Sequence, residues 1–358
     1  MRSALVIGGG IGGLTAAVGL HRTGWRVDVR ERGSDPPSTG TGLCLPPEAL
    51  RALDSLGVGD KTRRTALRHP DVPVRRPDGT ALGVLGAAGA YLATRPELLR
   101  VLASALPPGT IRFSSPADLS TAGDFDVVIG ADGVHSGVRG ALFGTGVRRV
   151  GAVAWWGTSA VPVPVGGETW GRGAKVRLTP RADGRTDWHA LVADRHDPSA
   201  DEHTPAAPRT TDDPARPFAD WHDPIPRLLA ESTDLSRHDP LHLPPLPTYV
   251  RGRVALLGDA AHAATPDLGR GACEAIVDGV VLATCLTAPD TGAALRAYDR
   301  ARRRRTQRLA FLSRRLNALA TTGRATALRD TALRVALALR PHPERPWSHD
   351  LEPDELAG

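Results

Sequence analysis

The sequence predicts an α/β fold that combines a Rossmann-like domain, an inserted domain built on a mainly antiparallel β-sheet, and a C-terminal helical region. Three observations favour it. Apolar runs that read as buried strands and enter glycine turns begin near residues 4, 126 and 253. Residues 150–195, between the second and third of these runs, hold short β-like runs. From residue 293 to about 339 the pattern is almost entirely helical.

The N-terminal segment has the pattern of a nucleotide-binding β-α-β unit. Residues 4–7 read as a buried strand, and an Ala- and Leu-rich helical segment follows. Between them, Gly8, Gly10 and Gly13 have the spacing G-x-G-x-x-G. The first glycine permits a tight turn, the second lets the backbone approach a pyrophosphate, and the third lets the helix pack on the strand. The helix N-terminus then offers free N–H groups and a positive dipole end to the phosphates.

An acidic residue completes this unit. A second strand, over residues 25–29, is followed by Glu31, which lies 18 residues after Gly13. That spacing is close to the ~20 residues expected for an acid that binds a ribose hydroxyl. FAD or NAD fits this site better than NADP, because a carboxylate would repel a 2′-phosphate. The alternative, a Gly-rich turn in an unrelated α/β protein, leaves Glu31 as a coincidence.

Bulk properties restrict the class of protein. The 358 residues suffice for two domains, and the 41% hydrophobic and 23% charged content is typical of a folded soluble protein. Met1 leads directly into the first strand, which leaves no room for a signal peptide, and no apolar run approaches the ~18 residues of a membrane span. We therefore expect a cytoplasmic protein. The three scattered cysteines, which have no metal-binding pattern, are Cys44, Cys273 and Cys285.

The net charge of +6 comes almost entirely from arginine, since Lys61 and Lys175 are the only lysines. Because no nucleic-acid-binding module accompanies this charge, we expect no nucleic-acid partner. The densest run, residues 302–305, lies in a helical pattern with Leu309 and Leu312 on one face. We expect these arginines to be solvated or to face an anion. A positive field also attracts a polyanionic nicotinamide cofactor.

Changes in composition suggest three parts. Residues 70–93, which include Pro-Asp-Gly, predict a hairpin, and residues 196–217, rich in Pro, Asp and Thr, predict a long loop. The expected boundaries are 1–70, 94–150 and 250–292 for the Rossmann-like domain, 71–93 and 151–249 for the inserted domain, and 293–358 for the C-terminal helices and tail.

Two later segments narrow the class of dinucleotide protein. Residues 126–139 read Asp-Val-Val-Ile-Gly-Ala-Asp-Gly-Val-His-Ser-Gly-Val-Arg. Residues 253–271 read Arg-Val-Ala-Leu-Leu-Gly-Asp-Ala-Ala-His-Ala-Ala-Thr-Pro-Asp-Leu-Gly-Arg-Gly. In the second segment Asp259 ends a buried strand, where α/β sheets place their ligands. Its carboxylate can accept hydrogen bonds from the hydroxyls of an extended cofactor, or it can cap the helix that follows.

Together the three motifs resemble the single-component, group A FAD-dependent aromatic monooxygenases, the para-hydroxybenzoate hydroxylase-like family. The resemblance spans residues 1 to about 320 and includes Glu168-x-Trp170-Gly171-x-Gly173, which is similar to the substrate-domain strands of that family. It implies a monooxygenase that binds FAD, consumes NADH or NADPH, and reacts with dioxygen through a flavin C4a-hydroperoxide. One oxygen atom would enter an aromatic substrate, phenolic, polycyclic or indolic. The composition suits bacterial secondary metabolism, such as antibiotic biosynthesis.

The resemblance implies roles for particular residues. Pro266 would form a wall beside the reacting flavin ring, and backbone N–H groups at Gly269 and Gly271 would stabilise negative charge on it. Arg270, where the family often has Gln, would place a fixed positive charge near the ring, unless it points outward. Arg95 would hold a phosphate or ribityl oxygen, or else be an exposed helix arginine. The cofactor-binding residues implied are Gly8, Gly10, Gly13, Glu31, Arg32, Arg95, Asp132, Asp259 and Gly271.

Other candidates have two interpretations each. Arg139 either contacts a cofactor or forms a surface ion pair, and His262 is expected to be structural. Cys273, where the family often has Asn, is expected to pack. Trp156, Trp170 and Trp188 either cover a dry substrate pocket or form the core of the inserted sheet. No base that would deprotonate a phenol is identified.

Several functions remain open at this point. A related flavoenzyme would catalyse epoxidation, Baeyer–Villiger oxidation or reduction of a prenyl chain. A non-catalytic flavin-binding sensor and a nicotinamide dehydrogenase are alternatives of other classes. The substrate, the choice between NADH and NADPH, and the oligomeric state, monomer or homodimer, do not follow from the sequence.

Overall fold

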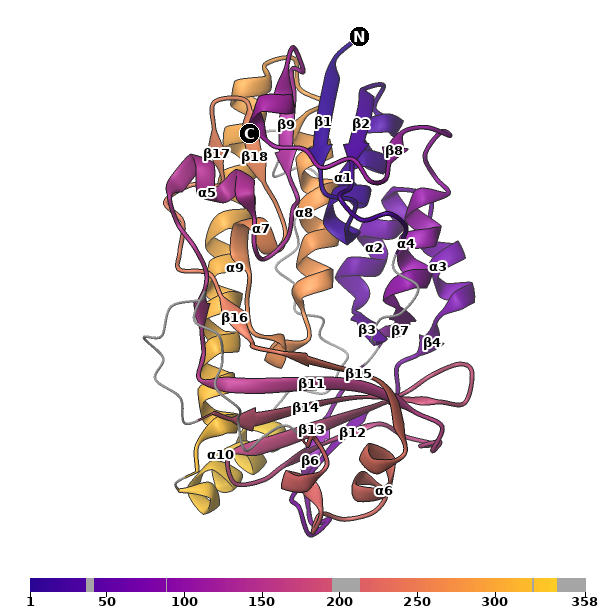
Figure 1. Ribbon diagram of the computed structural model, residues 1–358, viewed down its shortest axis with the longest axis vertical. Helices are drawn as coiled ribbons and strands as arrows, with labels where there is room; N and C mark the ends of the chain where they lie inside the picture. Colours follow the sequence, from indigo (N-terminus) through magenta and orange to yellow (C-terminus); the bar gives the residue numbers. More distant parts are fainter. Residues whose placement is uncertain (37–41, 88, 195–212, 324, 340–358) are drawn as a thin grey trace.

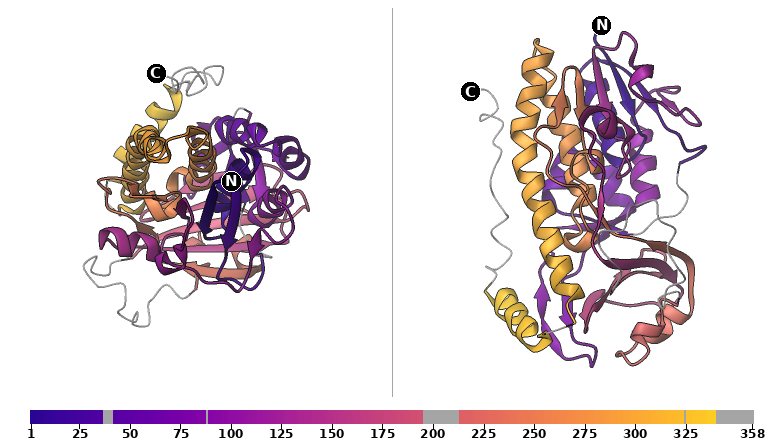
Figure 2. Two further views of the ribbon diagram at one scale, coloured as in Figure 1. Left: turned by 90° about the horizontal axis from the view of Figure 1, so that it is seen from above. Right: turned by 60° about the vertical axis from the view of Figure 1, so that its left-hand side comes forward.

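Two large β-sheets organise the chain (Figure 1). A six-stranded sheet lies at one end of the molecule, a seven-stranded sheet crosses the other end, and the long helix α9 (Thr291–Thr321) runs alongside both (Figure 2). Among the residues described, no helix combines the length and the apolar character that crossing a bilayer requires. This computed structural model describes residues 1–36, 42–87, 89–194, 213–323 and 325–339.

The six-stranded sheet confirms the Rossmann-like part of the predicted fold. Its order is β17-β18-β9-β1-β2-β8, and all pairs are parallel except β17 with β18. Strand β1 is buried along its whole length, as expected of a parallel strand with helices on both faces. The strands are β1 (Ser3–Ile7), β2 (Arg26–Arg30), β8 (Ile111–Arg112), β9 (Val127–Gly130), β17 (Val250–Arg251) and β18 (Val254–Leu256).

Helices α1 and α8 pack closely together beside this sheet. Glycine permits the approach: a Cβ at Gly19 would lie 2.6 Å from the Cβ of Ala283, and one at Gly279 would lie 2.7 Å from the backbone nitrogen of Ala16. The helices of this part are α1 (Ile11–Arg22), α2 (Pro47–Ser55), α3 (Gly59–Thr65), α4 (Arg95–Ala103), η1 (Leu119–Ala122), α5 (Gly137–Phe143), α7 (Asp259–His262), η3 (Pro266–Leu268) and α8 (Gly271–Cys285). Two small sheets are formed by β3 (Gly42–Leu45), β7 (Tyr91–Thr94) and β4 (Leu67–Arg68), and by β10 (Arg148–Arg149) and β16 (Leu241–His242).

The seven-stranded sheet confirms the predicted antiparallel insertion. Its order is β15-β11-β14-β13-β12-β5-β6, and only β12 and β5 pair in parallel. Strands β5 and β6 form the hairpin predicted within residues 70–93. The domain boundaries given above remain a prediction. The strands are β5 (Val72–Arg75), β6 (Ala81–Leu85), β11 (Ala152–Ser159), β12 (Gly167–Trp170), β13 (Ala174–Pro180), β14 (Thr186–Ala193) and β15 (Ser232–His238).

The two faces of this sheet have different neighbours. On one face, Trp155 and Trp188 form a core with Phe218 and the apolar side chains of the short helix α6 (Ile225–Ala230), next to η2 (Arg216–Phe218). On the other face, Trp170 and Leu191 pack near apolar residues of α9 and α10 (Thr326–Ala338). Part of that second face lies under the Rossmann-like domain. Most of the predicted loop over 196–217, and the tail from residue 340, fall outside the described residues.

Helix α9 corrects the prediction for the arginine run. Arg302 is 1% exposed and forms buried ion pairs, while Leu312, expected on the apolar face, is 44% exposed. The buried side of the helix is instead largely polar, with Thr306, Ser313 and Asn317 almost fully buried. Arg302 thus faces anions, as one of the two alternatives had it, but the predicted apolar face was wrong. The helix packs on polar loops and buried carboxylates of the Rossmann-like domain, so its inner face carries groups that bind them.

Replacing Gly13 with alanine should destabilise the protein, because the new Cβ would lie 2.1 Å from the carbonyl oxygen of Gly8. Overpacking of this kind costs about 1–3 kcal/mol. Gly140 is a matched helical control, since nothing lies within 4 Å of a Cβ there and alanine favours helix. Denaturant unfolding of the two variants checks this. Equal stabilities for Gly13→Ala and Gly140→Ala would contradict the packing role of Gly13.

Candidate active site

The three sequence motifs meet at the carboxyl edge of the parallel sheet. Strands β1, β9 and β18 end side by side, and each continues directly into its motif. Gly8 has a φ of +112°, and a Cβ there would lie 2.3 Å from the carbonyl oxygen of Ala131. A Cβ at Gly12 would lie 2.6 Å from the side chain of Leu257. The backbone segments are therefore packed so closely that only glycine fits, and together they form one ligand-binding edge.

The first motif leaves an open anion site. Gly10 occupies the N-cap of α1, no side chain caps the helix, and its first turn has no acidic residue. The guanidinium of Arg95 lies 4.0 Å from the position of a Cβ at Gly10. The carboxylate of Glu31 accepts hydrogen bonds from Gly9 N–H at 2.7 Å and Gly33 N–H at 2.8 Å. Positive and hydrogen-bonding groups thus surround the N-terminus of α1, and Arg32 beside them is exposed.

Asp132 in the second motif binds its own turn. Its carboxylate accepts hydrogen bonds from Ser136 Oγ at 2.5 Å and from Val138 N–H at 3.1 Å, at the start of α5. Arg139 is 2% exposed, which excludes the surface ion pair considered for it. Its guanidinium donates to carbonyl oxygens that include those of Val134 at 2.8 Å and Ala260 at 3.3 Å. The second motif is therefore fastened to the third.

Asp259 does not cap the helix that it begins. Gly258, with a φ of +58°, takes the N-cap position of α7, and no side chain caps this helix. The Asp259 side chain is exposed, and no described residue donates a hydrogen bond to it. Its carboxylate is therefore free to accept hydrogen bonds from a ligand at the sheet edge.

The loop over 266–271 is held from two sides. Asp267, in η3, forms a buried ion pair with Lys175 of β13 at 2.7 Å. The other carboxylate oxygen of Asp267 accepts a hydrogen bond from Asn317 of α9 at 2.9 Å. Pro266 begins η3, Gly269 follows it with a φ of +63°, and Gly271 opens α8. The seven-stranded sheet and α9 thus fix the path of this loop.

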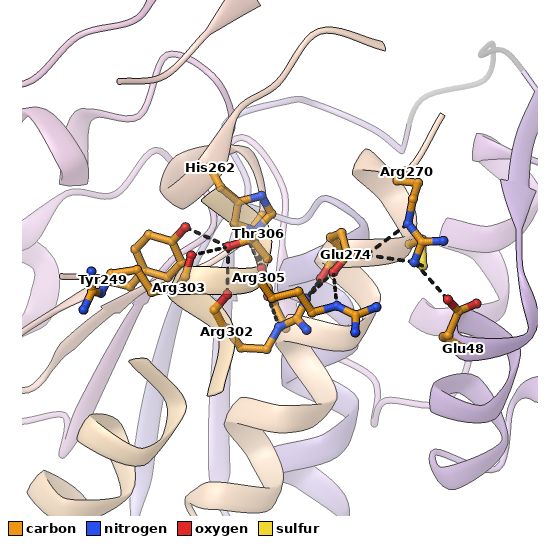
Figure 3. Close-up of polar contacts among 12 residues, drawn as sticks. Glu48, Tyr249, His262, Arg270, Glu274, Arg302, Arg303, Arg305 and Thr306 are labelled. Carbon is orange, nitrogen blue, oxygen red and sulfur yellow. Dashed lines mark hydrogen bonds and ion pairs between the residues drawn. The ribbon is translucent and has the colours of Figure 1, made fainter. Parts of the chain in front are cut away.

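Arg270 neither points away from the protein nor carries an isolated charge. Its Nη2 lies 3.1 Å from Glu48 and 2.9 Å from Glu274 (Figure 3). Two carboxylates therefore offset its charge, and its position near a flavin ring stays a prediction. Cys273 is fully buried, and burial raises the pKa of its thiol to about 12, in agreement with a packing role.

A buried charge network lies behind the third motif (Figure 3). The carboxylate of Asp278, in α8, accepts hydrogen bonds from Gly258 N–H at 2.9 Å, His262 Nε2–H at 2.6 Å and Arg302 Nε–H at 2.7 Å. Arg302 also binds Glu274 at 2.6 Å. Burial opposes ionisation, but the facing charges raise the pKa of His262 and lower that of Asp278. His262 is therefore bound to Asp278 and is not a free base.

The seven-stranded sheet contributes a row of polar and aromatic side chains. Cross-strand pairing aligns Trp156, His189, Arg177 and Glu168 on β11, β14, β13 and β12. We call the side of the sheet that carries this row the site face. Arg177 ion-pairs with Glu168, and its Nη1 lies 3.0 Å from the position of a Cβ at Gly269. The row therefore lies directly against the 266–271 loop.

The predicted tryptophans divide between the two faces. Trp156 stacks on His189, with ring centroids 4.5 Å apart. Trp170 is buried on the same face and donates from Nε1 to Glu168 at 2.9 Å. Trp188 lies in the core on the opposite face and donates to Ser232 at 2.6 Å, so its assignment to the substrate pocket is wrong. Strand alternation decides this, because Trp188 and His189 are neighbours and must point to opposite faces.

The sequence interpretation did not single out Lys175, Arg177 or His189. A signal was present in β13, where Lys175 and Arg177 alternate with Val176 and Leu178. Such alternation indicates a strand with one polar face. The pattern could not show which element packs against that face, because Asp267 and Gly269 lie about 90 residues later in the sequence.

Replacing Asp278 with asparagine should lower the free energy of unfolding by about 3–5 kcal/mol, because Arg302 and His262 would lose their shared buried partner. The matched control is Asp54→Asn, which breaks an exposed ion pair with Arg63 and should cost at most about 1 kcal/mol. Denaturant unfolding of the FAD-loaded proteins provides the measurement. A similar small loss in both variants would contradict the importance of the network.

The raised pKa of His262 also predicts a pH dependence of stability. Its contribution should be complete below the ordinary value of 6.5 and should disappear as the pH rises through the pKa of the folded state. Wild type should therefore lose stability relative to His262→Gln as the pH rises above 6.5. Unfolding curves measured across this range test it, and parallel profiles for the two proteins would exclude a charged His262.

Comparison with known proteins agrees with this arrangement. Residues 1–91 and 124–313 match the family described as "FAD binding domain". The chain is 32% identical over 346 residues to a FAD-dependent urate hydroxylase of Klebsiella pneumoniae, covering 87% of this chain and 88% of that protein. It is 32% identical over 331 residues to the 3-amino-4-hydroxybenzoate 2-monooxygenase PtnB3 of Streptomyces platensis, covering 83% of each.

Solved structures give the same result. The structure of Klebsiella pneumoniae HpxO complexed with FAD and uric acid matches with a TM-score of 0.80 and 29% identity, covering 93% of each chain. A salicylate hydroxylase substrate complex matches with a TM-score of 0.78 and 25% identity, covering 96% of this chain and 99% of the other. This chain therefore belongs to the FAD binding domain family, and it is a flavoprotein monooxygenase of the para-hydroxybenzoate hydroxylase-like group.

Proposed function

We propose that this protein uses NADH or NADPH and dioxygen to insert one oxygen atom into a small aromatic substrate, in bacterial secondary metabolism. The observation that carries the proposal is the meeting of three separate motifs with the polar row of the site face, around the 266–271 loop. Bound FAD would supply the chemistry, by taking electrons from the nicotinamide and delivering oxygen from dioxygen to the substrate.

The geometry of the first motif supports binding of the adenosine and pyrophosphate half of FAD. The uncapped N-terminus of α1 offers N–H groups to phosphate, and Arg95 lies beside it. Glu31 would accept hydrogen bonds from ribose hydroxyls. We assign cofactor contacts to Gly8, Gly10, Gly13, Glu31, Arg32, Arg95, Asp132, Asp259 and Gly271.

The flavin ring would lie between the 266–271 loop and the site face. Pro266 and the backbone at Gly269 and Gly271 would border it, with N–H groups at the start of α8 near the ring. Arg270, held by Glu48 and Glu274, would keep this end of α8 in position. The ion pair between Lys175 and Asp267 would anchor η3 to β13 and so fix the position of the loop beside the reacting ring.

The names of the relatives support an aromatic substrate. They act on urate and on 3-amino-4-hydroxybenzoate, which are small, planar and polar. The site face offers a matching surface, with Trp156 as an aromatic wall and charged groups beside it. Trp170 would support Glu168 from the same face.

The purified protein should be yellow and should oxidise NADH or NADPH faster when a suitable aromatic is present. Mass spectrometry of the product formed under ¹⁸O₂ should show one added ¹⁸O atom. A protein that binds no flavin after reconstitution would overturn the proposal. Addition of hydrogen without oxygen would instead indicate a reductase.

Asp259→Asn should bind FAD about 10- to 100-fold more weakly, because a hydrogen bond to a charged group contributes about 1.5–3 kcal/mol. The matched control is Asp124→Asn. Asp124 is an exposed aspartate just before β9, at the amino-terminal end of the parallel strands, whereas Asp259 follows their carboxyl end. FAD affinity measured by quenching of flavin fluorescence distinguishes the two. Unchanged affinity in Asp259→Asn would show that this carboxylate does not hold the cofactor.

A further inference from the structure

Within the part of the chain that the structure describes, His189 of the site face has a ring nitrogen that no protein group uses. Its Nε2 is shielded from solvent and has no hydrogen-bond partner among the described residues. A buried polar atom left unpaired costs about 1–3 kcal/mol, so such atoms are rare in folded proteins. An unpaired nitrogen beside a binding loop is therefore typical of a group that meets its partner in the ligand.

The position of His189 is fixed by its strand. In β14 the neighbouring Trp188 and Ala190 pack in the core of the opposite face, so His189 points to the site face. Trp156 stacks on it from β11, with the two rings inclined by 27°, and Arg177 lies directly across on β13. The imidazole is thus held between an aromatic wall and a guanidinium.

The cross-strand neighbour of His189 brings it close to the reacting loop. Arg177 reaches Gly269, and Lys175, two residues earlier on the same strand, binds Asp267. A substrate ring that lies between the loop and the site face would therefore contact the row of side chains that contains Arg177 and His189. This step rests on the proposed function, because it assumes that the 266–271 loop borders the flavin.

The charge state of His189 allows it to accept a hydrogen bond. Burial, followed by the positive charges of Lys175 and Arg177, lowers its pKa to about 3, so the ring is neutral at pH 7. A neutral imidazole with its hydrogen on Nδ1 offers the lone pair of Nε2.

The carboxylates of Glu168 and Asp187, which lie on this face, already accept hydrogen bonds from protein groups. The carboxylate of Glu168 accepts from Arg177 Nε at 2.6 Å and from Trp170 Nε1 at 2.9 Å. The carboxylate of Asp187 accepts from Gly42 N–H at 2.9 Å and from Thr158 Oγ1 at 2.8 Å. A substrate that donates a hydrogen bond to this face would therefore meet Nε2 of His189.

We propose that Nε2 of His189 is the group that recognises a ring hydroxyl of the substrate, by accepting its hydrogen bond. Trp156 lies beside the ring. His189 thereby selects a hydroxylated aromatic over the same ring without the hydroxyl, and it increases the electron density of the ring that receives oxygen.

The test uses three pairs of compounds that differ by one hydroxyl: 3-amino-4-hydroxybenzoate with 3-aminobenzoate, and salicylate and para-hydroxybenzoate, each with benzoate. Dissociation constants for the FAD-loaded protein come from changes in flavin absorbance. In wild type, at least one phenol should bind 10-fold or more tightly than its partner. His189→Leu should reduce that preference to within 2-fold, and His189→Gln, which keeps an acceptor, should retain part of it.

His222→Gln is the matched control. This histidine forms a hydrogen bond with Thr169 of β12 at 3.0 Å. Thr169 lies between the site-face residues Glu168 and Trp170 in the strand, so its side chain is on the opposite face of the sheet. The control should keep the wild-type preference. Absence of a preference for any phenol in wild type, or an undiminished preference in His189→Leu, would overturn the proposal. Flavin binding and NAD(P)H oxidation by wild type report on the proposed function separately, so the two failures can be told apart.

Discussion

The site depends on one buried carboxylate, that of Asp278. It binds the backbone N–H of Gly258, the imidazole of His262 and the guanidinium of Arg302, and so joins the end of β18 to helices α7, α8 and α9. Because the carboxylate is shielded from water, its charge has to be matched by these partners. The same arrangement fixes the turn from which Asp259 projects. Cofactor binding and stability are therefore linked through a residue that itself lies behind the ligand-binding edge.

A second pair of buried charges aligns the two large sheets. Lys175 belongs to the seven-stranded sheet and Asp267 to the loop after the parallel sheet, and their ion pair is almost fully buried. Asn317 of α9 completes the contact. Because an unpaired charge here would be costly, the loop and the site face hold each other at a fixed distance. The inner side of α9 is polar for a similar reason. Its side chains bind backbone carbonyl and carboxylate groups of loops that would otherwise be buried without partners.

The parts of the fold that the sequence predicted are those set by local rules. The glycine spacing after β1, the apolar runs of the parallel strands and the hairpin over β5 and β6 each follow from patterns within about 20 residues. The free carboxylate of Asp259 agrees with the ligand-binding interpretation over the helix cap. Trp188 and the apolar face of α9 were misassigned for a shared reason. Their environment is set by which element packs on which face, and residues far away in the chain determine that.

The most direct measurement is an experimental structure of the protein with FAD bound. The account predicts that the ribityl chain lies on Asp259 and that the isoalloxazine ring lies between Pro266 and the row that contains Arg177 and His189. A flavin ring bound away from the 266–271 loop, with Asp259 still exposed to water, would contradict it.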